Sequence, residues 1–453
     1  MHSKKYLLRF IPRALKKRVQ GRPYLQKIIS NTSWLIADNV LRMLIGLIVG
    51  VWVARYLGPA YFGELNYVLA LVGIFSVIAS LGIDSNIVRD LVREPEKQSE
   101  ILGTAFRLKI VSTVLSAIAC VSMISVLRPQ HPQTIWLVAI LSAGIVFLAI
   151  ETISLWFQSQ LQSKYTVYAK NIAYVLGAMI RVGLILNAAP LIAFAWAGLV
   201  EASLAAFALV FVYYKKQGCL PIAWTANWSR AKSMLHAGWP LLLSSISSML
   251  YLRLDMLMLG EMSGDHSVGI YGAATRLSEV WYFIPMAIVS SLLPSLVRAR
   301  EQSRERYFER LFQIYRLMAA ISVLVSVLVM FTADPLINLL YGAQYKGAGQ
   351  VLALHIWASV AVFLGVASSQ YLIIENMQKL SFYRTTIGLA CNAILNLVLI
   401  PDFGVLGAAV ATLISYCVAT FSLVFFPSAR SQAQLMFKSL SPIQWARLIR
   451  SAQ

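Results

Sequence analysis

Residues 33–54, SWLIADNVLRMLIGLIVGVWVA, and residues 63–88, GELNYVLALVGIFSVIASLGIDSNIV, are two long apolar runs with Gly58 and Pro59 between them. A helix that crosses a bilayer needs about 20 mostly apolar residues, so each run is long enough to span a membrane. A Gly-Pro pair is typical of a tight turn. This stretch therefore predicts a hairpin of two transmembrane helices.

The rest of the chain has the same character. Its 453 residues are 58% hydrophobic and only 13% charged, whereas a soluble domain carries roughly 25% charged residues. These figures exclude an ordinary soluble protein, a disordered chain, a collagen and a disulfide scaffold. We predict an all-α, polytopic membrane protein. Its twelve spans are expected at residues 33–54, 63–88, 105–127, 134–157, 166–188, 191–213, 236–260, 267–297, 311–333, 350–376, 380–400 and 404–426.

The distribution of Lys and Arg predicts the orientation. Of 39 such residues, 32 lie in or next to the N-terminus, the even-numbered loops and the C-terminus. The other seven are Arg55, Arg128 and Lys346 in odd-numbered loops, and Arg42, Arg181, Arg253 and Arg276 inside spans. Cytoplasmic loops are enriched in cations, so both termini are expected in the cytoplasm. This bias accounts for the net charge of +20 without a nucleic-acid partner.

A polar break at residues 214–235 divides the spans into two groups of six. The predicted domains are a basic N-terminal segment (1–32), a six-helix bundle (33–213), a cytoplasmic linker (214–235), a second six-helix bundle (236–426) and a C-terminal tail (427–453). Within 1–32, apolar residues alternate with cations, which fits either a helix lying on the membrane or a solvated tail. Segments 62–67 and 268–273 echo each other, as expected for repeats related by an axis along the membrane normal.

Several short motifs carry a family resemblance. The hairpin ARYLGPAYFG (54–63) closely resembles that of bacterial polysaccharide flippases in the multidrug/oligosaccharidyl-lipid/polysaccharide exporter superfamily. Further similar segments follow in the family's order: LRLDMLMLG (252–260), VGIY (268–271), LLYGAQY (339–345), NAILNL (392–397) and GVLGAA (404–409). The resemblance implies two six-helix bundles around a central cavity, which move a lipid-linked glycan from the cytoplasmic to the periplasmic leaflet.

Four cations at membrane depth are the candidate substrate-binding residues. Charges there are costly and usually functional, and the planar guanidinium binds phosphate oxygens bidentately. We therefore expect Arg42, Arg253 and Arg276 to hold the diphosphate of a lipid-linked glycan. Arg181 either joins them or reaches the external interface.

Three acids are candidates for ion coupling, namely Asp38, Asp255 and Glu279. Asp38 lies four residues from Arg42 and Glu279 three residues from Arg276, so each acid either pairs structurally with its neighbour or serves transport. Arg253 and Asp255 are two residues apart and point in different directions. Both need partners on other helices, which favours a site that changes partners during transport.

The predicted function is a flippase for an undecaprenyl-diphosphate-linked oligosaccharide used in O-antigen, capsule or exopolysaccharide assembly at the bacterial inner membrane. Its expected partners are this substrate, membrane lipids and accessory proteins such as a polysaccharide polymerase and export proteins. The alternatives are an ion-coupled drug exporter of the same superfamily and, less favoured, a membrane enzyme that polymerises or ligates lipid-linked glycans. The sequence has no nucleophile motif, Walker A run or Cys/His metal spacing, so we expect no catalytic residue, cofactor or metal.

Overall fold

The computed structural model describes residues 23–218 and 220–441, and within these ranges the chain is helical with no strand. The longer helices are α3 (Pro23–Ala79), α4 (Asp84–Arg93), α5 (Gln98–Leu127), α6 (Pro132–Ala143), α7 (Thr152–Ser159), α8 (Lys164–Leu186), α9 (Leu191–Gln217), α10 (Trp228–Ser263), α11 (Asp265–Glu279), α12 (Phe283–Gln302), α13 (Arg304–Leu340), α14 (Ala348–His355), α15 (Ala358–Ile374), α16 (Gln378–Phe421) and α17 (Arg430–Ser439). Short 3-10 turns are η1 (Pro95–Lys97), η2 (Gly144–Glu151), η3 (Pro221–Ala223), η4 (Val280–Tyr282), η5 (Ala343–Tyr345) and η6 (Ser422–Phe425).

Ten helical stretches in the described ranges are long and apolar enough to cross a membrane. Two of them are bent double-length helices. α3 turns at Gly58 (φ 72°, ψ 170°) and α16 at Gly404 (φ 53°, ψ −125°). A positive φ costs glycine little because it has no Cβ. With two stretches that each contain two helices, the architecture agrees with the all-α fold predicted and is consistent with twelve spans.

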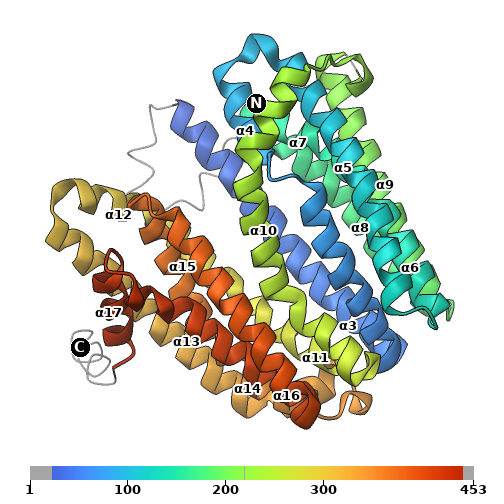
Figure 1. Ribbon diagram of the computed structural model, residues 1–453, viewed down its shortest axis with the longest axis vertical. Helices are drawn as coiled ribbons and strands as arrows, with labels where there is room; N and C mark the ends of the chain where they lie inside the picture. Colours follow the sequence, from blue (N-terminus) through green and yellow to red (C-terminus); the bar gives the residue numbers. More distant parts are fainter. Residues whose placement is uncertain (1–22, 219, 442–453) are drawn as a thin grey trace. The chain divides into compact units, whose positions relative to one another are not determined.

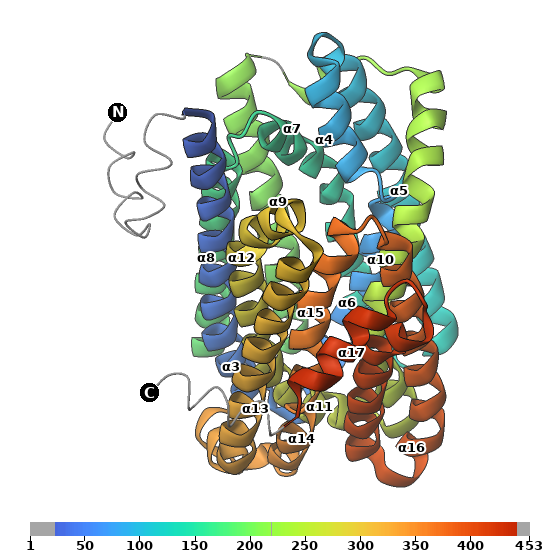
Figure 2. The ribbon, with the colours of Figure 1, turned by 90° about the vertical axis from the view of Figure 1, so that its left-hand side faces the viewer.

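The chain forms two compact units. Unit 1 comprises Met1–Val49 and Phe75–Leu243, and unit 2 comprises Gly50–Ile74 and Ser244–Gln453. Unit 1 thus contains α4 to α9, both ends of α3 and the first part of α10 (Figures 1 and 2). Unit 2 contains α11 to α17, the remainder of α10 and the bend of α3.

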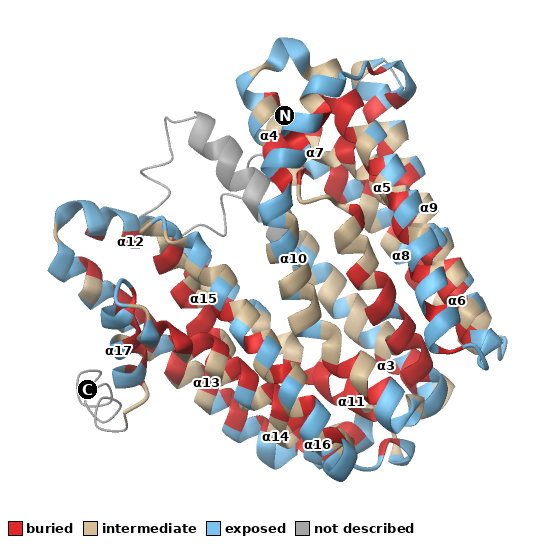
Figure 3. Ribbon diagram, in the orientation of Figure 1, coloured by how far each residue is buried: buried red, intermediate tan, exposed pale blue. Residues whose placement is uncertain are grey.

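The exposed surface of the helices is strongly apolar. Figure 3 shows buried and exposed positions alternating along the same helices, and large apolar side chains such as Val126, Leu186 and Phe331 are 76–80% exposed. Soluble proteins rarely expose large contiguous apolar surface. Contact with lipid accounts for this pattern, since lipid tails are themselves apolar.

The bend of α3 is fixed inside unit 2 by the 344–345 segment. Pro59 has no N–H to donate to the C=O of Arg55, and the amide of Gln344 supplies that bond (Nε2–O 2.7 Å). The hydroxyl of Tyr345 donates to the C=O of Ala54 (2.7 Å). Two motifs of the family resemblance, 54–63 and 339–345, therefore contact each other.

The same bend packs against the start of α11 through two equivalent close contacts. A Cβ on Gly63 would overlap the C=O of Asp265, and a Cβ on Gly269 would overlap the C=O of Pro59. Residues 59 and 63 match 265 and 269 in the faint internal repeat. Equivalent residues therefore make equivalent contacts, as a two-fold axis through this point requires.

Proline also explains the break between α11 and α12. Pro285 lacks the N–H that would bond to the C=O of Trp281, and η4 lies at Val280–Tyr282. Pro240, by contrast, lies within the continuous helix α10. Residues 1–22, for which the sequence fits either a membrane-surface helix or a solvated tail, lie outside the described residues. Part of the predicted tail forms α17, whose Ala433 and Met436 pack into an apolar cluster with α13 and α15.

Candidate functional site

The main polar cluster of unit 2 surrounds the carboxylate of Asp255 on α10. Its Oδ1 accepts hydrogen bonds from Asn392 Nδ2 (2.8 Å) and Asn396 Nδ2 (2.5 Å). Its Oδ2 accepts from Thr412 Oγ1 (2.7 Å) and Tyr271 Oη (3.0 Å). All five side chains are buried, with Asp255 4% exposed.

The bend of α16 brings three of the residues in this cluster together. Asn392 and Asn396 are one helical turn apart before Gly404, and Thr412 follows the bend. A Cβ on Gly407 would overlap the C=O of Leu399, so glycine lets the two halves approach closely. The cluster therefore joins α10, α11 and both halves of α16.

The Asp255 cluster is electrostatically unusual, because all four donors are neutral and Asp255 forms no ion pair among the described residues. A buried charge is costly unless it is paired or hydrogen-bonded. The hydrogen bonds partly offset that cost without supplying a countercharge. Such a site has a carboxylate and several oxygen atoms available to a proton or a small cation.

A second buried polar contact lies beside this cluster. His355 Nδ1 and Ser278 Oγ are 3.0 Å apart, and both side chains are buried. The imidazole ring also contacts the ring of Tyr271 edge-on, with centroids 6.0 Å apart. Sequence reasoning quoted Tyr271 only within the VGIY motif (268–271) and did not name His355. It assigned a role to neither, because the pattern does not show which residues they contact.

The predicted cations of unit 2 have different surroundings. Arg253 Nη2 lies 3.9 Å from Glu279 Oε2, and both side chains are about one-third exposed (33% and 32%). Arg253 and Asp255 thus find partners on other helices, as their spacing required. Glu279 contacts Arg253 instead of its sequence neighbour Arg276.

Arg276 forms no ion pair with any described residue. Its guanidinium lies over the ring of Phe62, 5.6 Å from the centroid. A Cβ on Gly50 would overlap this guanidinium, so a glycine at position 50 leaves room for it. Both neighbours belong to the α3 segment of unit 2.

The predicted cations of unit 1 are each paired with an acid. Arg42 Nε donates to Asp38 Oδ1 (2.8 Å), one turn away on α3, and its guanidinium lies over the ring of Tyr174. Arg181 on α8 pairs with Glu201 on α9 (2.8 Å).

Arg384 is a buried cation that the sequence reasoning did not single out. Arg384 was counted with the loop before its span, yet it is only 9% exposed. Its guanidinium donates to the hydroxyls of Ser368 and Ser369 and to the C=O of Gly365. Nothing local in the sequence marks these partners, since they are 15–19 residues away.

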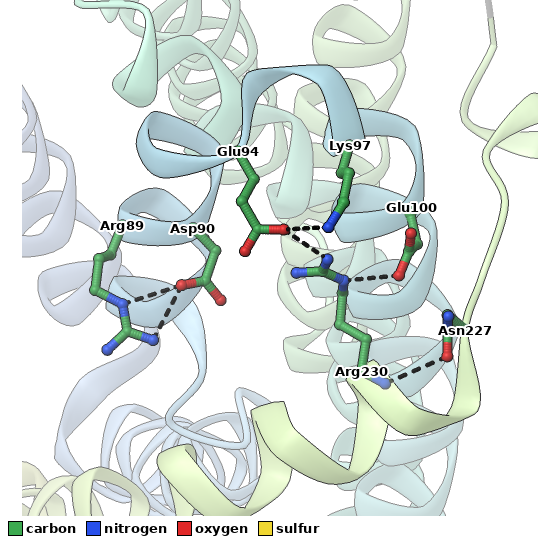
Figure 4. A network of polar contacts seen from close by, with 7 residues as sticks. All are labelled: Arg89, Asp90, Glu94, Lys97, Glu100, Asn227 and Arg230. Carbon is green, nitrogen blue, oxygen red and sulfur yellow. Dashed lines mark hydrogen bonds and ion pairs between the residues drawn. The ribbon is translucent and has the colours of Figure 1, made fainter.

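An ion network in unit 1 joins α4, α5 and the start of α10 (Figure 4). Arg230 pairs with Glu94 and with Glu100, both at 2.9 Å, and Lys97 also contacts Glu94 (3.1 Å). The Arg230 hydrogen bond, followed by that of Lys97, lowers the pKa of Glu94 below its ordinary value.

The sequence matches two family models. The model described as "Polysaccharide biosynthesis protein" matches residues 28–299, which is more than half of the chain. The chain belongs to this family. A second model, MatE, matches residues 240–398.

Curated relatives agree with this membership, and a solved structure has a similar fold. The chain is 22% identical to the capsular polysaccharide biosynthesis protein CapF of Staphylococcus aureus, over 88% of this chain and 99% of CapF. It is 23% identical to Agl15 of Haloferax volcanii, a probable low-salt glycan biosynthesis flippase, over 81% of this chain and 76% of Agl15. The fold is similar to that of the lipid II flippase MurJ in an inward closed conformation, with TM-score 0.69, 17% identity and 90% of each chain covered.

Proposed function

We propose that this family member is a flippase that moves an undecaprenyl-diphosphate-linked oligosaccharide from the cytoplasmic leaflet to the opposite leaflet by alternating access. The product would serve the assembly of O-antigen, capsule or exopolysaccharide. The main support is the full-length similarity to a capsular polysaccharide biosynthesis protein, together with the similarity to a probable glycan flippase. In this proposal the protein transports its substrate and catalyses no covalent reaction.

The proposed setting is the bacterial inner membrane, with both termini in the cytoplasm. The bias of Lys and Arg toward the even-numbered loops supports this orientation. The predicted halves 33–213 and 236–426 are the proposed moving bundles, except that residues 50–74 would move with the second half because they belong to unit 2. A polysaccharide polymerase and export proteins are the proposed later partners, because a flipped repeat unit must be polymerised and exported.

Arg276 is the strongest candidate for binding the diphosphate. It is the one among the four predicted cations that forms no direct ion pair with a described residue, although Glu279 interacts with it electrostatically. A phosphate would therefore not have to displace a paired acid from its guanidinium. Arg253 is a second candidate because its contact with Glu279 is long, at 3.9 Å. Arg42 and Arg181 would have to exchange their acidic partners for the substrate.

Asp255 is the proposed ion-coupling residue, with Asp38 and Glu279 as weaker candidates. Its carboxylate is buried among neutral donors, so binding a proton or sodium ion would neutralise the charge. Asn392 and Asn396 could turn their amide oxygens toward a cation. Both coupling ions remain compatible with this geometry.

Deletion of the gene tests the function directly. Lipid-linked repeat units should accumulate on the cytoplasmic leaflet while surface polysaccharide disappears. Arg276→Ala should reduce export about tenfold or more, since a hydrogen bond to a charged group contributes about 1.5–3 kcal/mol. Arg276→Lys should also impair export, because lysine lacks the planar fork.

Exposed Arg306 is the control for these variants, and Arg306→Ala should export normally. Normal export by Arg276→Ala, Arg253→Ala and Arg42→Ala, each present at wild-type abundance, would contradict the cation assignment. The MatE match at residues 240–398 favours a drug exporter as the second candidate. Loss of resistance to cationic drugs with intact glycan export would select that function.

A further inference from the structure

Unit 1 has an apolar groove that the proposed transport function does not use. Its volume is about 880 Å³, and it lies between α5, the second half of α3 and the segment that opens α10. The α5 side chains that line it recur at helical spacing and include Arg107, Val111, Leu115 and Ala119. Val111 and Leu115 are 58% and 61% exposed, so this face is not covered by the protein.

The groove has the length of one membrane leaflet. Its lining on α5 runs from Thr104 to Ala119, which at 1.5 Å per residue is about 22 Å. Half of a hydrocarbon core is about 15 Å thick, and the headgroup region occupies the remainder. An acyl chain of a phospholipid fits this length, whereas an extended undecaprenyl chain is much longer than the groove.

The two ends of the groove differ in chemistry. Arg107 lies near one end, is exposed, and forms no hydrogen bond or ion pair with a described residue. Trp228 lies at the same end and is 80% exposed, as is typical of tryptophans at the membrane–water interface. Along α5 the lining beyond Arg107 is mainly apolar up to Ala119, with Ser112 and Ser116 as its polar side chains.

The linker closes the charged end of the groove. The backbone N–H of Asn227 donates to Thr104 Oγ1 (3.0 Å), and that of Thr225 donates to Ser99 Oγ (3.3 Å). These bonds hold the linker and the first turn of α10 beside α5. The groove is therefore bounded by fixed elements at its polar end.

We propose that this groove binds an acyl chain of an anionic phospholipid, with the headgroup phosphate on Arg107. In the orientation proposed above, the lipid belongs to the cytoplasmic leaflet. An unpaired arginine at headgroup depth selects a net negative headgroup, because each cation near a membrane surface contributes about 1 kcal/mol, or about fivefold, to such binding. The apolar face along α5 accepts the chain.

Native mass spectrometry of the purified, delipidated full-length protein tests the proposal. Dioleoylphosphatidylglycerol and dioleoylphosphatidylcholine are titrated separately, and the bound lipid is counted. The wild type should retain one phosphatidylglycerol about fivefold more tightly than phosphatidylcholine. Arg107→Gln should abolish this preference, whereas Lys232→Gln, which changes an exposed lysine outside the groove lining, should preserve it.

Variants that fill the groove provide a second, independent test of the proposal. Ala119→Phe should weaken binding of both lipids, and Ile118→Phe, on the exposed neighbouring position outside the lining, should not. Equal behaviour of Arg107→Gln and Lys232→Gln, or of the two phenylalanine variants, would overturn the proposal.

Displacement of phosphatidylglycerol by equimolar undecaprenyl phosphate would overturn it in favour of the lipid carrier. Loss of lipid on dimerisation would instead assign the groove to a second copy of the chain. None of these readouts requires transport, so failure here is distinguishable from failure of the flippase proposal.

Discussion

At the scale of single residues, the surroundings of Asp255 favour a functional role over a purely structural one. Its oxygens accept four hydrogen bonds from neutral side chains, at 2.5–3.0 Å. A structural ion pair would instead have a cation within reach. The chain has a charged carboxylate at position 255, although the neutral amide of an asparagine could form hydrogen bonds with the same neighbours. This favours a role for Asp255 in binding a proton or a cation.

Asp255→Asn should therefore leave folding intact and abolish export. The asparagine can present its oxygen to Asn392 and Asn396 and its NH₂ to the hydroxyls of Tyr271 and Thr412, which can accept as well as donate. Membrane abundance and surface polysaccharide are measured together. Asp402→Asn, at an exposed acid on the same helix as the asparagines, is the control and should export normally. Disappearance of the Asp255→Asn protein from the membrane would show a structural role.

Sequence spacing predicted part of this site but not its composition. Two residues that are two apart on a helix point differently, so the need of Arg253 and Asp255 for other partners followed directly. The identity of those partners did not, because Asn392 and Thr412 lie 137 and 157 residues away from Asp255. The spacing of Arg276 and Glu279 suggested a local pair, and the structure pairs Glu279 with Arg253 instead.

At the scale of elements, the bend of α3 depends on a buried hydroxyl. Tyr345→Phe removes the donor to the C=O of Ala54, and a buried polar group left without its partner costs about 1–3 kcal/mol. Thermal unfolding in detergent should show this loss. Tyr341→Phe is a matched control, since Tyr341 is equally buried and its hydroxyl has no hydrogen-bond partner among the described residues. Equal destabilisation by both changes would contradict the assigned bond.

The ion network of Figure 4 is expected to stabilise unit 1 in a pH-dependent way. The pKa of Glu94 is lowered in the fold, so its contribution is present above the ordinary pKa and is lost as pH falls through the lowered value. Glu94→Gln should reduce the unfolding temperature slightly at pH 7, and the difference from wild type should vanish in acid. Glu96→Gln, at an exposed acid two residues away, should have no effect at either pH. A difference that persists in acid would exclude this linkage.

At the scale of the whole molecule, composition and apolar runs were sufficient to predict the fold class. The ten apolar stretches, with bends at Gly58 and Gly404, follow from the spacing of apolar runs and glycines. The inclusion of residues 50–74 in unit 2 could not be predicted in this way. It depends on contacts such as that of Tyr345 with Ala54, which are 291 residues apart, and on close approach at Gly63 and Gly269.

The reciprocal contacts at Gly63 and Gly269 bear on how the chain crosses the membrane. Two equivalent hairpins related by a two-fold axis along the membrane normal must have their turns on the same side of the membrane. Residues 58 and 264 should therefore lie at the same membrane surface. The charge bias predicts that this surface is the external one. Reporter fusions after residues 130, 189, 264, 342 and 402 should therefore be external, and those after 97, 163, 225, 303 and 453 internal. Two or more reversals would reject the twelve-span topology, because a single miscounted span inverts every fusion that follows it.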